Sequence, residues 1–275
     1  MKRATTLLAV AIVLGACSQD APAPATDEAA PADAVSEAPA APDSGIYAAA
    51  VANENRPTGD YERDANRKPA EVLAFLGIRP GMHVLDMFSG GGYYTELLSL
   101  VVGDAGRVTA HTNKAYVDFV GEEFEARYAN DRLPNVDVLW AENNELDLEP
   151  GQYDAIMLVL SYHDIYFTPD NVNWPKIDGP KLLAELHEGL RDDGFIGLVD
   201  HAALPGSGQE TGNTVHRIDR DLVVAEMAAA GFVLDAESDL LRNPDDDRSL
   251  SAFDPSIRGK TDRFVLRFRK APATD

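Results

Sequence analysis

The chain has 275 residues, and its 46 acidic residues outnumber its 24 lysines and arginines, which gives a formal net charge of −22. Proteins that bind the phosphate backbone of DNA or RNA normally cluster Lys and Arg, so this charge argues against a nucleic acid as substrate. The single cysteine excludes an internal disulfide.

The first 17 residues predict export. Two basic residues precede an apolar run at 7–14, which is too short to span a membrane and is typical of a signal peptide. The Leu-Gly-Ala-Cys sequence that ends at Cys17 resembles the lipobox of bacterial lipoproteins. This resemblance implies that 1–17 is a lipoprotein signal peptide, that Cys17 is acylated, and that the lipid is the only membrane contact. Because Ser18 follows, the resemblance favours the periplasmic side of the outer membrane. A cleaved secretory peptide with a chance cysteine is the alternative.

Residues 18–44 consist mostly of Ala, Pro, Asp and Glu. Such a segment has too few large apolar side chains to bury, and we expect a disordered tether. The remaining residues, 45–275, have the size of one α/β domain, and no internal repeat indicates a solenoid. The sequence therefore predicts a single domain on a flexible leader.

Apolar strands alternate with helical patterns along this domain, which favours a parallel sheet covered on both faces. The predicted fold class is α/β: a Rossmann-like, doubly wound, mostly parallel seven-stranded sheet with helices on both faces. Ligands of such sheets lie beyond the carboxyl ends of the strands. The predicted strands are 82–87, 106–111, 135–140, 153–160, 194–201, 231–238 and 262–269, and the predicted helices are 68–77, 92–102, 114–128, 178–191 and 219–230.

A glycine turn follows the first strand. Asp86 lies near the end of the strand, and the turn that contains Gly90 and Gly92 leads into an amphipathic helix. Glycines allow close approach of a ligand to the backbone, and the helix N-terminus offers unpaired N–H groups. A dinucleotide fingerprint needs a third glycine where Thr95 stands, which makes NAD the second choice. An ordinary strand-to-helix turn is the structural alternative.

This segment resembles motif I of the class I S-adenosylmethionine (SAM)-dependent methyltransferases, although Phe88 stands where that family most often has its first glycine. The resemblance extends to a Leu-Arg-Asp-Asp-Gly turn that begins at Leu190, and most of 55–270 is similar to a bacterial group of predicted methyltransferases. It implies SAM as the cofactor. The motif residues that would hold SAM are Asp86, Ser89, Gly90, Gly91 and Gly92.

The ends of the second and third strands supply further candidates. The family usually has an acidic residue after the second strand to accept hydrogen bonds from the ribose, but here Thr112 or Asn113 takes that place. Both side chains can bind a hydroxyl, and both can equally serve as a helix N-cap. After the third strand, Glu142 occupies the position that resembles the acceptor for the adenine amino group, and Asn143 can read the ring edge. A plain surface turn is equally compatible there.

The fourth strand ends in Tyr162, His163 and Asp164, where apolar residues give way to polar ones beside the expected methyl group. Methyl transfer is an in-line displacement that needs alignment and, for many acceptors, removal of a proton. His163 is the candidate base, with Asp164 or Tyr162 orienting it or the acceptor. A metal centre of His163, His201 and His216 has no supporting local spacing, and no metal is predicted.

Two functions from different classes follow. The first is a lipid-anchored methyltransferase that acts on a small molecule. The second is a surface-tethered binding module that kept the fold and lost the reaction, which the missing acidic residue after the second strand and the export signal both favour. Export bears on the choice because SAM is made in the cytoplasm, and the sequence shows no supply of it outside. A fold also does not guarantee its usual activity.

Overall fold

The computed structural model describes residues 45–170 and 174–272. The predicted signal peptide, Cys17 and the tether lie outside these residues. Among the helices that are described, none has the length and apolar character needed to cross a membrane.

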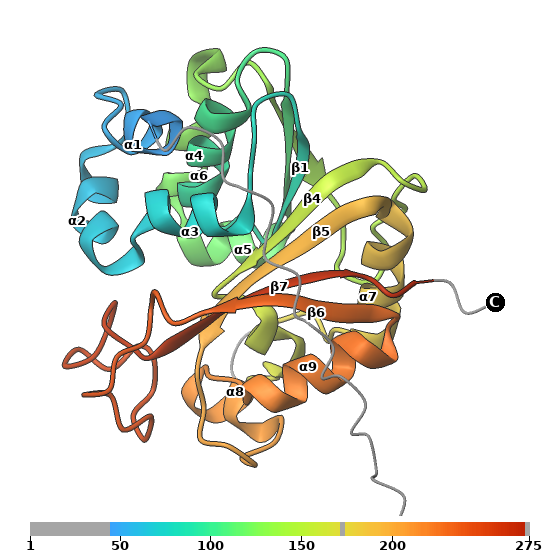
Figure 1. Ribbon diagram of the computed structural model, residues 1–275. Coiled ribbons are helices and arrows are strands. Elements are labelled where there is room, and N and C mark those ends of the chain that lie inside the picture. Colours follow the sequence, from blue (N-terminus) through green and yellow to red (C-terminus); the bar gives the residue numbers. More distant parts are fainter. Residues whose placement is uncertain (1–44, 171–173, 273–275) are drawn as a thin grey trace, which may run out of the picture. The chain divides into compact units, whose positions relative to one another are not determined.

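The described strands form one seven-stranded sheet in the order β3-β2-β1-β4-β5-β7-β6 (Figure 1). β7 runs antiparallel to both β5 and β6, whereas the other neighbouring strands pair in parallel. This confirms the predicted Rossmann-like class. The strands are β1 (His83–Met87), β2 (Arg107–Thr112), β3 (Val136–Trp140), β4 (Tyr153–Val159), β5 (Leu190–His201), β6 (Phe232–Ser238) and β7 (Arg263–Lys270).

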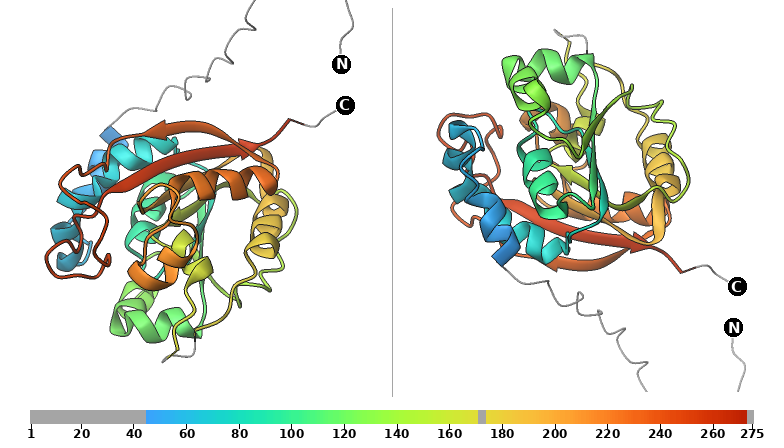
Figure 2. Two further views of the ribbon diagram at one scale, coloured as in Figure 1. Left: turned by 90° about the horizontal axis from the view of Figure 1, so that it is seen from below. Right: turned by 90° about the horizontal axis from the view of Figure 1, so that it is seen from above.

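Helices cover both faces of the sheet (Figure 2). One apolar cluster joins α1, α3 and α4 to one face, and a second cluster joins α7 and α9 to the other. The helices are α1 (Gly45–Val51), α2 (Thr58–Arg67), α3 (Pro69–Leu76), α4 (Tyr93–Val102), α5 (Lys114–Val120), α6 (Glu122–Tyr128), α7 (Gly179–Gly189), α8 (Glu210–Val215) and α9 (Arg220–Ala229), with 3₁₀ turns η1 (Ala129–Asp131) and η2 (Tyr162–Tyr166).

The element boundaries follow the sequence pattern with two exceptions. The prediction of a single helix at 114–128 is wrong, because Gly121, with φ 60° and ψ −133°, divides this segment into α5 and α6. The expected strand 194–201 begins earlier, at Leu190, and pairs with Tyr153 across an irregular register. The helices α1, α2 and α8 were not predicted. α1 and α8 have seven and six residues, too few turns to show a clear period in the sequence, whereas α2 has ten residues, TGDYERDANR, which are mostly polar.

Side chains along a strand alternate between the two faces of the sheet. This alternation decides which face the polar side chains at the end of each strand are on. In β1, Val84 belongs to the cluster under α4 and Leu85 to the opposite cluster. Asp86 therefore faces α4. In β5, Ile196 and Leu198 pack against the α7 and α9 layer, so Asp200, two residues further on, faces that layer as well.

Candidate active site

The carboxylate of Asp86 is held inside the protein. It is 3% exposed and accepts a 2.6 Å hydrogen bond from the Thr95 hydroxyl in α4. Burial raises the pKa of Asp86 to about 7, against the lowering effect of the Thr95 hydroxyl and backbone N–H. Asp86 thus fixes the start of α4 to the end of β1, and this is the position that the sequence assigns to cofactor binding.

One of the three motif glycines is needed by the protein itself. A Cβ atom on Gly92, where φ is +76°, would lie 2.7 Å from Cγ of Arg127 in α6. At Gly91 the nearest atom to a Cβ would be Oε2 of the exposed Glu123 at 2.6 Å, the end of a flexible side chain. The Arg127 Nε also donates to the Gly91 carbonyl at 2.9 Å. Close packing of α6 on the turn therefore requires glycine at position 92.

Gly90 is different, because it has room beside it. Its φ is +56°, and the nearest atom to a Cβ there, in the described part of the chain, is a Val120 methyl at 3.8 Å. The neighbouring Ser89 hydroxyl donates to the His111 carbonyl at 3.0 Å, which ties the turn to β2. Gly90 is thus the motif glycine at which a ligand can come close to the backbone.

Phe88 occupies the left-handed region with φ +58°, where the family more often has glycine. Its N–H lies 3.4 Å from Nδ1 of His111, and its ring stacks on Tyr116 at 5.3 Å. Burial lowers the pKa of His111 to about 4, so the imidazole is neutral, and its Nε2 donates to the Ala141 carbonyl at 3.0 Å. His111 joins the ends of β1, β2 and β3, a role that the sequence pattern missed because its partners are remote in the chain.

The predicted ribose and adenine residues form a buried amide pair. Asn113 caps α5 by accepting from the Tyr116 N–H at 3.2 Å, and its Nδ2 donates to Oδ1 of Asn143 at 2.9 Å. Asn143 is 1% exposed, and within the described residues its own Nδ2 has no hydrogen-bond partner. Thr112 is buried, while Glu142 is exposed. The N-cap alternative for Asn113 is therefore correct, and the cofactor roles of these residues stay predictions.

Beyond β4, the 3₁₀ turn η2 places His163 against the end of β5. Leu160, with φ +57°, turns the chain, and its N–H donates to the Val199 carbonyl at 2.7 Å. The fully buried Asp200 carboxylate accepts from the His163 backbone N–H at 2.9 Å and contacts its Nδ1 at 2.8 Å. Asp200 was not among the predicted site residues, since it is separated from His163 by 37 residues and only the β4–β5 register joins them.

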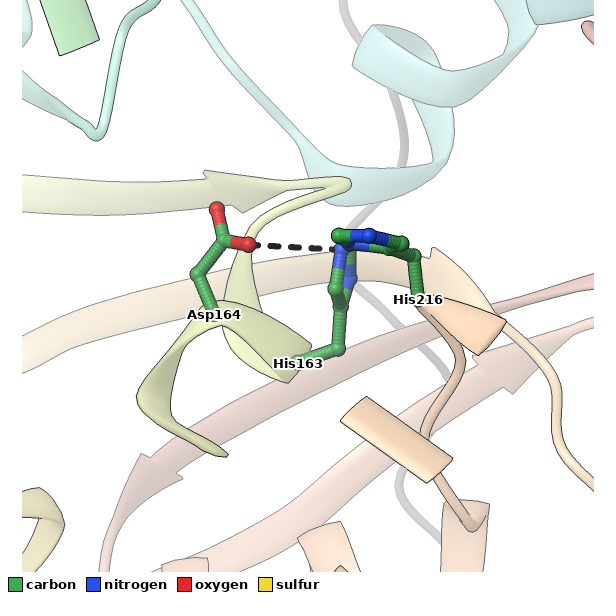
Figure 3. A group of neighbouring side chains, drawn as sticks. All are labelled: His163, Asp164 and His216. Atoms are coloured by element: carbon green, nitrogen blue, oxygen red, sulfur yellow. Dashed lines mark ion pairs between the residues drawn. The ribbon is translucent and has the colours of Figure 1, made fainter. Parts of the chain in front are cut away.

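The other side of the His163 ring faces Asp164 and His216 (Figure 3). Nε2 of His163 lies 3.4 Å from Oδ1 of Asp164, whose other oxygen accepts from the Tyr116 hydroxyl at 3.0 Å. The His163 and His216 rings are perpendicular, with centroids 5.6 Å apart. His201 lies 5.8 Å from His163, but its Nδ1 is bonded to the Thr261 hydroxyl. We call His163, Asp164 and His216 the histidine–aspartate group.

Of the three residues in the group, His163 has the highest pKa. Burial lowers its pKa, but the carboxylates of Asp200 and Asp164 outweigh burial and raise it to about 9. Burial and the charge of His163 lower the pKa of His216 to about 4, and burial raises that of Asp164 to about 6. At neutral pH His163 is an imidazolium, which cannot accept a proton. The catalytic roles predicted for His163, Asp164 and Tyr162 stay predictions.

Tyr162 has another partner. Its hydroxyl donates to Oε2 of Glu226 in α9 at 2.7 Å, and Tyr166 donates to the other oxygen of the same carboxylate. This pair fixes η2 to α9, and the ring of Tyr162 is fully buried. Its hydroxyl does not belong to the histidine–aspartate group.

Aromatic rings lie beside His216. The ring of His216 lies 4.6 Å from those of both Phe167 and Phe253, and Phe167 lies 5.2 Å from Trp174. The ring centroid of Phe119 lies 6.2 Å from that of Phe253 and 6.5 Å from that of Trp174, so these rings and His216 form a continuous series of contacts. Phe119 and Phe253 are 65% and 43% exposed. We call Phe119, Phe167, Trp174 and Phe253 the aromatic rim.

Comparisons with known proteins agree with this architecture. A family model for protein-L-isoaspartate(D-aspartate) O-methyltransferase matches residues 63–164, less than half of the chain. No curated protein is significantly similar in sequence. A SAM-dependent methyltransferase from Aquifex aeolicus is similar in structure with a TM-score of 0.52 at 21% identity, covering 78% of this chain and 98% of that one. An arsenic(III) S-adenosylmethionine methyltransferase from Chlamydomonas reinhardtii has a TM-score of 0.52 at 19% identity, covering 84% and 75%. The chain therefore has the Rossmann-like fold of the class I SAM-dependent methyltransferases.

Proposed function

We propose that the protein is a SAM-dependent methyltransferase that acts on a small, largely apolar acceptor. The observation that carries the proposal is the placement of the histidine–aspartate group at the carboxyl ends of β4 and β5, on a methyltransferase fold with a glycine turn after β1. In doubly wound sheets this edge is where ligands bind.

The residues present fit the cofactor. Gly90 has space for close approach, and the unpaired Nδ2 of the buried Asn143 is a donor of the kind that a ring nitrogen of adenine accepts. Ser89 and Thr112 add hydroxyl groups at the same strand ends. When bound, SAM supplies a methyl group on a sulfonium, which an acceptor lone pair can displace.

The histidine–aspartate group would manage the proton of the acceptor. His163 stays charged between its two carboxylates and holds Asp164 in place, while either the neutral His216 or Asp164 accepts the single proton that the acceptor loses as the new bond forms. Asp200 positions His163 through the backbone and the ring. Tyr162, bonded to Glu226, has no part in this step.

The aromatic rim supports a small, flat acceptor. Its rings lie beside His216, and Phe119 and Phe253 expose apolar surface that a flat acceptor would cover. The net charge of −22 argues against a nucleic acid. The matched family model names a protein acceptor, so the small-molecule proposal needs a direct comparison with proteins.

The test is transfer of a labelled methyl group. The full-length protein is incubated with methyl-labelled SAM and a panel of aromatic phenols, amines and thiols, with mixed protein and RNA as competing acceptors. We expect label in a small aromatic product, and a loss of about 100-fold in Asp164→Asn. The control, Asp118→Asn, removes an exposed carboxylate that is paired with Lys114.

Each result separates the alternatives. Label in protein or RNA would refute a small acceptor. Transfer to none of them by a protein that still binds SAM would reject the enzyme in favour of the tethered binding module.

Anchoring of this enzyme at the envelope through Cys17 is part of the proposal and rests on the lipobox sequence alone.

A further inference from the structure

We propose that His163, Asp164 and His216 bind a divalent transition-metal ion such as Zn²⁺. One ligand atom from each residue lies within 4.8 Å of the other two. Two imidazoles and a carboxylate are a common ligand set for catalytic zinc, with the fourth position left to water or substrate. Binding of the ion is independent of the proposed methyl transfer, whereas its role in catalysis rests on it. In the metal-bound form these three side chains would hold the ion and would not accept the acceptor's proton.

The distances suit such an ion. Zinc binds His nitrogen at about 2.0–2.1 Å and carboxylate oxygen at about 2.0–2.2 Å, which separates two ligand atoms by about 3.4 Å at a tetrahedral angle. Nε2 of His163 and Oδ1 of Asp164 are 3.4 Å apart. His216 is half-buried and supplies the third ligand atom, which lies within 4.8 Å of the other two.

Two ligands already have the outer partners that metal sites use. A metal-binding His usually pairs its other ring nitrogen with a carboxylate, which fixes the ring and its tautomer. Asp200 does this for His163, with Oδ1 2.8 Å from Nδ1, so that Nε2 faces the group. The Tyr116 hydroxyl holds the second oxygen of Asp164 at 3.0 Å.

The acidic surroundings of His163 also favour a dication. Oδ1 of Asp164 lies 3.4 Å from Nε2 of His163, and Oδ1 of Asp200 lies 2.8 Å from Nδ1. Two acidic side chains beside one imidazole attract a divalent cation. The fourth position would be left to an acceptor oxygen or sulfur, whose pKa the ion would lower.

Titration calorimetry with Zn²⁺ on the full-length, chelator-treated protein, without SAM, tests the proposal. We expect one ion per chain, and visible absorption of the Co²⁺ form that reports nitrogen and oxygen ligands. His216→Ala should weaken binding by at least 100-fold, and Asp200→Asn by about 10- to 100-fold through its outer contact. His187→Ala, which removes a histidine in α7 that packs on Phe232, is the control and should bind as the wild type does.

The outcomes are decisive in either direction. Folding of each variant is checked by thermal unfolding of the metal-free form. Absence of Zn²⁺ and Co²⁺ binding to the wild type, or equal binding by the wild type and a folded His216→Ala variant, would overturn the site. SAM affinity is measured on the same metal-free samples, so that a protein that binds SAM but no metal refutes this site and leaves the proposed function standing.

Discussion

Replacing Asp200 by Asn tests the electrostatics of the site. The Asp200 carboxylate is fully buried and accepts from the His163 N–H, from the His163 ring and from the His201 N–H. A pKa of about 9 for His163 in the folded chain, against 6.5 in the unfolded chain, corresponds to about 3 kcal/mol of stability. Because the folded-state pKa is the higher one, this contribution is complete below about pH 6.5 and is lost as the pH rises through about 9.

Asp200→Asn removes the nearer of the two carboxylates that raise the pKa of His163 and leaves Asp164 alone to oppose burial. Breaking a buried ion pair costs about 3–5 kcal/mol, so we expect a deficit of that size near pH 6 that shrinks, by at most about 3 kcal/mol, towards pH 10. Urea unfolding of the metal-free proteins, followed by circular dichroism, measures it. Asp164→Asn, whose carboxylate lies 3.4 Å from His163 rather than 2.8 Å, should change the pH dependence less. Parallel stability curves for the wild type and Asp200→Asn would refute the assignment of the proton to His163.

Three further changes test other parts of the account. Gly77→Ala, at φ +83° with open space around it, should lower the free energy of unfolding in urea by about 1 kcal/mol. Gly92→Ala, at φ +76°, should cost about 1–3 kcal/mol more, because its Cβ meets the Arg127 side chain at 2.7 Å. Equal costs would contradict the packing of α6 on the turn. The double variant Phe119→Ala, Phe253→Ala should raise KM for an aromatic acceptor about 10-fold with kcat and Tm nearly unchanged, since both rings are exposed; an unchanged KM would remove the aromatic rim from the acceptor site. Cys17→Ser should abolish incorporation of labelled palmitate and release the protein from membranes; continued labelling would place the lipid elsewhere.

The sequence predicts the sheet well because period-two alternation and glycine turns are local signals. β1 with its turn and α4 were predicted from a motif of about 15 residues, and the structure has both. The break at Gly121 was missed because the apolar pattern continues from α5 into α6. The positive φ of Gly121 nevertheless ends α5 and separates it from α6.

The site was harder to predict because its contacts join distant segments. His163 and Asp164 were found from the change to polar residues after β4, but the partner Asp200 depends on the β4–β5 register. The pKa of His163 depends in turn on Asp200, so the sequence alone does not show whether His163 holds or accepts a proton. For Asp86, the motif predicts a residue that binds the cofactor. The motif does not predict that the Asp86 carboxylate accepts a hydrogen bond from the Thr95 hydroxyl.

Calorimetry with SAM and S-adenosylhomocysteine tests the central claim most directly. The full-length protein is compared with Gly90→Leu, which places a side chain in the open space of the turn, and with Gly77→Leu, which strains a similar positive-φ glycine remote from the site. The account predicts that the wild type and Gly77→Leu bind both nucleosides and that Gly90→Leu binds neither. Failure of the wild type to bind either one, or undiminished binding by Gly90→Leu, would contradict a cofactor site at this turn.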